Sequence, residues 1–232
     1  MLKNIFNIPR EKADEKSIDV IKPGSFAAIL ARAGVGKTAL LVQIAINAMR
    51  QEKNVLHIST SDPVDKVDLW YREMLQRLNQ DNDKVQIDKM RDQLLRHRFI
   101  MTFETESFSI AKLKKRVDEL ISQEIFVPAQ IMIDDFSFET VTDEDLSALK
   151  KFVEDNSLIF WFSIRTHRDE AVNEKKLPTR LAHLTQWFDF MIRLDPESDR
   201  IYIRPVENGE SKDDETSLFL DPSTLLIQEL QP

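Results

Sequence analysis

Residues 31–38 read ARAGVGKT and join two segments whose apolar residues follow different spacings. Residues 25–30 are an apolar run typical of a buried strand, whereas Lys37–Arg50 carries apolar residues at helical spacing. The chain has only 4 glycines among 232 residues, where an average composition would give about 16. Two of them, Gly34 and Gly36, lie in this loop, where a tight turn needs backbone conformations that other residues avoid. The segment therefore predicts a strand, a tight loop and a helix, which is a unit of α/β folds.

The loop fits the phosphate-binding pattern G-x-x-x-x-G-K-[ST], with Ala31 in place of the first glycine. In this pattern, backbone N–H groups and the positive end of the following helix attract phosphate. We expect Lys37 to reach the β- and γ-phosphates of a nucleotide, and the Thr38 hydroxyl to bind Mg²⁺. The sequence thus predicts binding of ATP and Mg²⁺, with the nucleotide held by Ala31, Arg32, Ala33, Gly34, Val35, Gly36, Lys37, Thr38 and Ala39.

A second segment, residues 130–135 (QIMIDD), reads as an apolar strand that ends in two carboxylates. Asp134 is positioned for the Mg²⁺ shell, and Asp135 for a general base or a group that orients the attacking water. The alternative is a strand that simply ends at a polar turn. The presence of the loop motif in the same chain favours the catalytic interpretation.

Strand and helix patterns alternate along the chain. Apolar runs at residues 54–59, 99–103, 130–133 and 158–163 are separated by helical patterns at 63–97, 109–123 and 142–155, the first interrupted near 79–83. This order predicts a parallel sheet covered by helices. Short strand candidates at 190–194, 201–204, 217–220 and 225–230 surround an Asn208-Gly209 turn. We therefore predict an α/β fold with a mainly parallel, twisted sheet flanked by helices and a C-terminal antiparallel extension.

Length and composition limit the number of domains, the cellular location and the kinds of partner that we expect. We expect one domain over residues 19–232, preceded by a tail at 1–18 that either frays or docks on a neighbouring subunit. The chain has no cysteine and no apolar run near the roughly 20 residues that span a bilayer, so we predict a cytoplasmic protein without membrane insertion. Its net charge of −8 does not favour nucleic acid, although residues 165–180 are locally basic.

These motifs resemble the RecA superfamily of P-loop ATPases, most closely its KaiC-like branch, with replicative helicases and RadA-type proteins nearby. The resemblance covers roughly residues 18–220 and is carried by PGSFAAILARAGVGKTALLVQIAINAM, NVLHIS, DLWYREML, QIMIDD, LIFWFS, HLTQWFDFMIRLD and RIYIRPVENGE. It implies a RecA-like P-loop NTPase fold and ATP hydrolysis. It also implies a ring or filament with nucleotide at subunit boundaries, or a regulatory protein partner.

The chain departs from this family at three positions. The second strand usually ends in a catalytic glutamate, but this chain reads Ser59-Thr60-Ser61-Asp62, so either Asp62 or Asp135 would have to activate water. Alternatively, Asp62 caps the helix after Pro63. Residues 205–208 (PVEN) lack the Lys-x-Arg offered to a neighbouring subunit, and Arg204 is either its replacement or a solvated strand residue.

The third departure concerns the sensor position. Ser163 ends the predicted fifth strand, where a polar sensor would contact the nucleotide, but Ile164 follows in place of the glutamine common in helicases.

The leading prediction is therefore an ATPase of low turnover that acts as a nucleotide-controlled assembly or regulatory switch. A non-hydrolysing ATP sensor or scaffold, a DNA-coupled motor, and a kinase using residues 165–180 as a lid are the alternatives.

Overall fold

Strands and helices alternate through the first two thirds of the chain, as the spacing of apolar residues predicts. The computed structural model describes residues 21–80, 82–104, 108–139, 141–167, 171, 178–207, 210–211 and 218–230. Its alternating part consists of β1 (Ser25–Arg32), α2 (Lys37–Arg50), β2 (Val55–Ser59), α3 (Val64–Leu78), α4 (Lys84–Leu95), β3 (Arg98–Thr102), α5 (Ile110–Ser122), β4 (Gln130–Asp134), α6 (Asp143–Asp155) and β5 (Ile159–Thr166). The predicted tail at 1–18 and the Asn208-Gly209 turn lie outside the described residues.

The C-terminal third adds strands to the same sheet. It contains a 3₁₀ helix, η2 (Thr179–Trp187), and then β6 (Phe190–Glu197), β7 (Arg200–Glu207), β8 (Glu210–Ser211), β9 (Leu218–Leu220) and β10 (Ile227–Glu229). The strand order is β10-β9-β7-β6-β1-β5-β4-β2-β3, with β8 paired to β7. Pairings from β6 to β3 are parallel, whereas β7, β8, β9 and β10 pair antiparallel. The predicted α/β sheet with an antiparallel C-terminal extension is confirmed.

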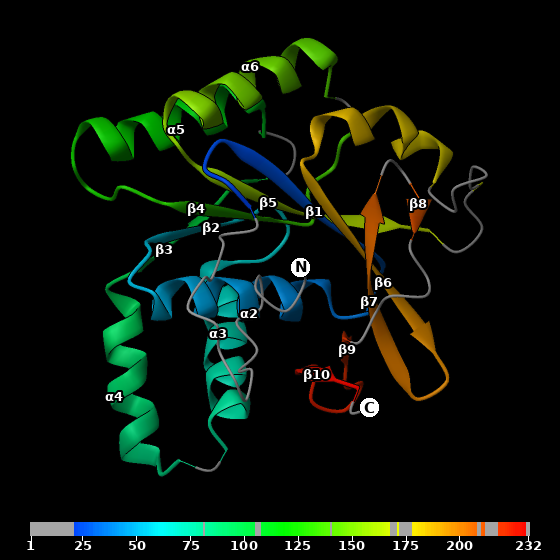
Figure 1. The fold of residues 1–232 in the computed structure, drawn as a ribbon. Coiled ribbons are helices and arrows are strands. Elements are labelled where there is room, and N and C mark those ends of the chain that lie inside the picture. Colours follow the sequence, from blue (N-terminus) through cyan, green and yellow to red (C-terminus); the bar gives the residue numbers. More distant parts are fainter. Residues whose placement is uncertain are drawn as a thin grey trace.

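Helices cover both faces of the parallel part of the sheet. Along β1, Ala27 and Ile29 pack into a core formed with α2 and α3, while Phe26, Ala28 and Leu30 pack into a core formed with α5 and α6. Figure 1 shows α5 and α6 on one side of the sheet, and α2, α3 and α4 on the other. Because successive strand residues point to opposite faces, a fully apolar strand is the pattern expected of such a double-sided core.

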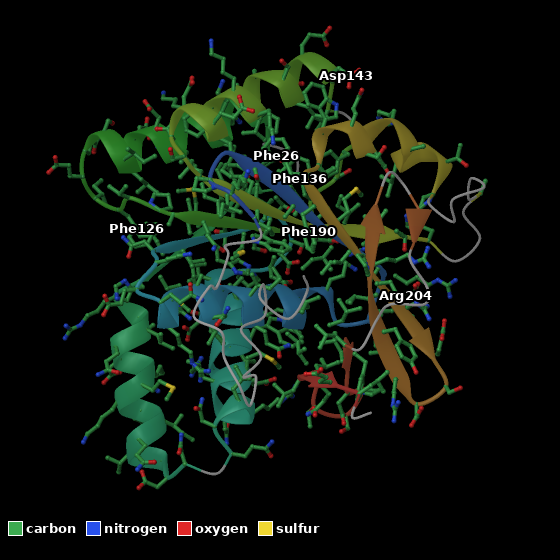
Figure 2. All side chains as sticks on the ribbon, viewed as in Figure 1. Phe26, Phe126, Phe136, Asp143, Phe190 and Arg204 are labelled. Carbon is green, nitrogen blue, oxygen red and sulfur yellow. The ribbon has the colours of Figure 1, made fainter. Side chains whose placement is uncertain are left out.

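Aromatic rings fill the core beneath α5 and α6. The Phe26 and Phe136 rings meet the Phe162 ring edge-on, at centroid distances of 5.3 and 5.2 Å. Figure 2 labels Phe26 and Phe136 in this layer. Phe138 is 4.4 Å from Phe136 in the same edge-on arrangement, which is a favourable geometry for aromatic pairs. This packing anchors the segment directly after Asp134, the last residue of β4, and Asp135, the first residue of the turn.

Two elements differ from the sequence-based expectation. β5 continues to Thr166, because its pairing with β1 extends to the register Arg32–Thr166. The helix η2 was not predicted: only two of its residues, Leu181 and Leu184, are buried leucines, and one pair three residues apart is too short a pattern to indicate a helix. Within the described part of the chain, no helix has the length and apolar character needed to cross a membrane.

Candidate functional site

The candidate residues gather at the carboxyl ends of β1, β4 and β5. After β1 the chain enters α2 on one face of the sheet, whereas after β4 and β5 it enters α6 and η2, whose leucines join the core on the opposite face. β1 and β5 are neighbours, so the connections diverge between them. In open α/β sheets, ligands bind outside the carboxyl ends of the strands at such a switch point.

The loop between β1 and α2 has the backbone conformation that its glycines allow. Gly34 has a φ of 77° and Gly36 a φ of 108°, both in the left-handed region that other residues rarely adopt. Gly36 occupies the N-cap of α2, without a side-chain cap, and no acidic residue lies in the first turn. Arg32, Ala33 and Gly34 are exposed. Neither the N-cap residue nor the first turn of α2 therefore supplies a carboxylate that would compete for the N–H groups of this helix.

The Lys37 side chain folds back over this loop. Its Nζ donates hydrogen bonds to the carbonyl oxygens of Ala31 at 3.3 Å and Arg32 at 3.2 Å. Burial lowers the pKa of the Lys37 ammonium from its usual value, the carboxylates of Asp135 and Asp134 oppose that shift, and Arg165 adds to it. The ammonium is thus held by neutral carbonyl groups, which an anion in the loop could replace.

Asp134 is fixed by hydrogen bonds to both carboxylate oxygens. Thr38 Oγ1 donates to Asp134 Oδ2 at 2.8 Å, and Ser163 Oγ donates to Oδ1. The backbone N–H of Asp135 donates to the same Oδ1 at 3.1 Å and to Ser163 Oγ at 2.7 Å. Thr38 and Asp134, 96 residues apart, therefore meet as the sequence analysis requires of two groups that share one cation.

Ser163 takes a different position from the one expected of a sensor at a strand end. It is fully buried, and β5 runs past it to Thr166, so the prediction that it ends the strand is wrong. Its hydroxyl lies between Asp134 and the Asp135 amide. Ser163 acts in this structure by orienting Asp134.

Asp135 forms an ion pair that the sequence analysis did not anticipate. Arg165 Nη2 lies 2.5 Å from Asp135 Oδ2, and about half of the Arg165 side chain is exposed. Asp135 itself has a φ of 55°, a conformation that aspartate tolerates better than most side chains. Alternation along β5 could have revealed this partner: Arg165 follows Ser163 by two residues and so shares its face of the sheet.

Asp62 lies after β2 and is also engaged. Its Oδ1 accepts a hydrogen bond from Lys66 Nζ at 2.8 Å, and its backbone N–H donates to Ser59 Oγ at 2.8 Å. The N-cap of α3 is Pro63, with no side-chain hydrogen bond. The alternative prediction that Asp62 caps this helix is wrong, because Asp62 is one residue too early to reach the first free amides.

Arg204 lies on β7 and points to its own hairpin (Figure 2). It is 9% exposed, and its Nη1 lies 2.6 Å from Glu197 Oε1 and 3.1 Å from Asp195 Oδ2. These bonds, the one to Glu197 above all, raise the pKa of the Arg204 guanidinium. The interpretation of Arg204 as a solvated strand residue is wrong. Most of the basic segment at 165–180 lies outside the described residues.

The donor atoms suit a hard cation that also binds phosphate. Thr38 Oγ1, at the start of α2, and Asp134 Oδ2, at the end of β4, are oxygen atoms 2.8 Å apart. Mg²⁺ commonly takes one or two carboxylates, and completes its octahedron with water and phosphate oxygens. Among the described residues, no cluster of three or more His, Cys, Asp or Glu could hold a metal ion by itself. The Thr38 and Asp134 oxygen atoms therefore fit Mg²⁺ whose remaining ligands are water and phosphate oxygens.

Comparison with known proteins identifies no family for this chain. The chain matches no protein-family model, and a search of curated proteins finds no match either.

Proposed function

We propose that this protein binds ATP with Mg²⁺ as a RecA-like P-loop ATPase of the KaiC-like type, with low turnover. The observation that carries the proposal is the hydrogen bond between Thr38 and Asp134, directly below a loop whose glycines adopt positive φ. A phosphate-binding loop works with a hydroxyl at the first turn of its helix and a carboxylate at the end of another strand of the same sheet. Both groups come together here from residues 96 positions apart.

Phosphate recognition would rest on Lys37 and on the amino end of α2. The Lys37 ammonium would exchange its bonds to the Ala31 and Arg32 carbonyl oxygens for phosphate oxygens. That exchange is favourable because phosphate oxygens carry a net negative charge that attracts the ammonium, whereas the carbonyl oxygens are neutral dipoles. The N–H groups of Ala33 to Ala39 and the dipole of α2 add to the attraction.

Thr38 and Asp134 would hold Mg²⁺. The bound ion would supply charge neutralisation at the β- and γ-phosphates, which is the part of phosphoryl transfer that side chains perform least well. Ser163 would keep the Asp134 carboxylate in place, through its buried hydroxyl.

Low turnover follows from the missing glutamate at the end of β2, because a shorter carboxylate, Asp62 or Asp135, would have to orient the water, and both are paired in this structure. Asp135 is paired with Arg165 at 2.5 Å, and Asp62 with Lys66 at 2.8 Å. A carboxylate oxygen engaged by a cation is poorly available to orient a water molecule. This observation also favours a second candidate, a sensor or scaffold that binds ATP without hydrolysing it. In either case nucleotide state would control assembly into a ring or filament, or binding of a regulatory protein.

Calorimetric titration with ATP and MgCl₂ tests the proposal. Wild-type protein should show saturable binding, which Lys37→Ala and Thr38→Val should weaken by at least an order of magnitude through loss of phosphate and cation contacts. Lys115→Ala is a matched control, because Lys115 is an exposed lysine on α5, and its Nζ lies 3.9 Å from Glu119 Oε1. If wild-type protein takes up no ATP, the proposal is wrong.

Phosphate release distinguishes the two candidates. If the wild-type protein releases phosphate from ATP slowly, and the Asp135→Asn variant releases it more slowly still, the ATPase is supported. Tight binding of ATP without any release supports the sensor. Stimulation of release by single-stranded DNA would instead favour a DNA-coupled motor.

A further inference from the structure

Arg165 lies beside the loop that would bind phosphate. It is the penultimate residue of β5, and its register partner on β1 is Ala31, the first residue of the loop motif. Its guanidinium reaches Asp135, which follows directly after Asp134. Arg165 therefore brings a positive charge to the carboxyl end of the sheet, besides those of Lys37 and Arg32.

Four charged side chains lie close to one another beside the loop. Lys37 and Arg165 carry two positive charges, and Asp134 and Asp135 carry two negative ones. Arg165 and both aspartates all influence the pKa of Lys37, so the four groups are close enough to interact. A triphosphate adds several negative charges to this group. Its terminal phosphate would then compete with Asp135 for the nearest guanidinium.

The geometry points to Arg165 as the residue that distinguishes ATP from ADP, by leaving Asp135 and binding the γ-phosphate. This inference rests on the proposed function. An ion pair at the surface contributes little, because both partners are partly hydrated, and here the Arg165 and Asp135 side chains are 51% and 24% exposed. An arginine can donate two parallel hydrogen bonds to a phosphate, which makes the exchange favourable.

The exchange has a consequence for Asp135. Once Arg165 has moved to the γ-phosphate, the Asp135 oxygen that it occupied becomes available to a water molecule. The backbone N–H of Asp135 remains bonded to Asp134 Oδ1 and Ser163 Oγ, so the carboxylate stays beside the site. With ADP, no γ-phosphate competes, and the ion pair persists. The pair would thus keep the site inactive until ATP is bound.

Affinities for ATP and ADP, each measured with MgCl₂, test this exchange in the full-length protein. Arg165→Gln should weaken ATP binding about tenfold or more, and ADP binding less than about twofold, since only ATP offers the γ-phosphate. Asp135→Asn should tighten ATP binding about two- to fivefold by removing the competitor. In the Arg165→Gln background, Asp135→Asn should no longer tighten it.

Arg72→Gln is the matched control. Arg72 pairs with Asp68 at 3.0 Å on α3, and its side chain is 52% exposed, much like Arg165. It should leave both affinities unchanged. If Arg165→Gln does not fold, Arg165→Lys carries the same test, with a smaller loss of ATP affinity because lysine cannot form the paired hydrogen bonds.

The outcomes separate this inference from the proposed function. If wild-type protein binds ATP through Lys37, but Arg165→Gln weakens ATP and ADP equally or neither, the inference is overturned and the proposed function stands. Failure of Asp135→Asn to tighten ATP binding also overturns it. Absence of ATP binding by the wild-type protein overturns both.

Discussion

His57 is a titratable group in the core, on β2, two residues before the end of that strand. It is fully buried, and its Nδ1 lies 2.9 Å from the Tyr71 hydroxyl on α3. Burial lowers the pKa of His57 to about 4, while Asp134 raises and Arg98 lowers it to smaller extents. The folded protein therefore keeps this imidazole neutral at pH values where an exposed histidine is charged.

The free energy of unfolding should decrease as pH falls from about 6.5 towards 4, by up to about 1.4 kcal/mol per pH unit. In this range the unfolded chain binds a proton at His57 and the folded protein does not, so acid favours unfolding. Above about pH 6.5 both states are neutral, and the contribution disappears. Urea unfolding at several pH values measures the slope. His57→Gln should reduce it, whereas His183→Gln, at an exposed histidine, should not. Equal slopes in wild type and His57→Gln would contradict the assignment.

Residues of the candidate site were predictable where they are close in sequence. The loop motif and the two aspartates are each local patterns, and their positions follow from spacing. The ion pair between Arg165 and Asp135 joins residues 30 positions apart, and depends on how β4 and β5 align. Alternation along β5 places Arg165 on the same face as Ser163, but it does not identify Asp135 as the partner of Arg165.

Helix starts show how local signals define elements. In α6, Thr142 Oγ1 accepts a hydrogen bond from the Asp145 N–H at 3.1 Å, and Asp145 Oδ2 accepts from the Thr142 N–H at 3.3 Å. This reciprocal pair confirms the predicted start. In α5 only one such bond forms, from the Lys112 N–H to Ser109 Oγ, and in α3 none. Helices α2 and α3 have no side-chain cap and were predicted from the spacing of their apolar residues, whereas η2 has no such cap and was not predicted.

Thr142→Ala should lower the free energy of unfolding by about 1 kcal/mol, because it leaves an orphan N–H at the start of α6. Asp62→Ala should change it by less than about 0.5 kcal/mol, because Asp62 caps nothing and its pair with Lys66 is an exposed one. Chemical denaturation of both variants measures the difference. A loss in Asp62→Ala as large as that in Thr142→Ala would show that Asp62 supports α3 after all.

At the scale of the whole molecule, the C-terminal segment packs against the loop and against α2. A Cβ on Gly36 would lie 3.3 Å from Leu220 and 3.4 Å from Leu225. Gln43 on α2 donates from Nε2 to the Leu225 carbonyl oxygen at 2.8 Å, and its Oε1 accepts from the Ile227 N–H at 3.1 Å. These contacts join residues more than 180 positions apart, so sequence patterns predicted the strands but not where they dock.

Gln43→Leu should therefore weaken the attachment of the C-terminal segment specifically. It leaves the Leu225 carbonyl and the Ile227 N–H without their side-chain partner, which should lower the free energy of unfolding by roughly 2 kcal/mol or more. Because β9 and β10 lie at the sheet edge, we expect their amides to exchange with solvent faster, while those of β1, β4 and β5 keep their protection. Hydrogen exchange measured by mass spectrometry, with exposed Gln86→Leu as control, resolves this pattern. Uniformly faster exchange across the sheet would mean that the C-terminal strands unfold only together with the parallel core.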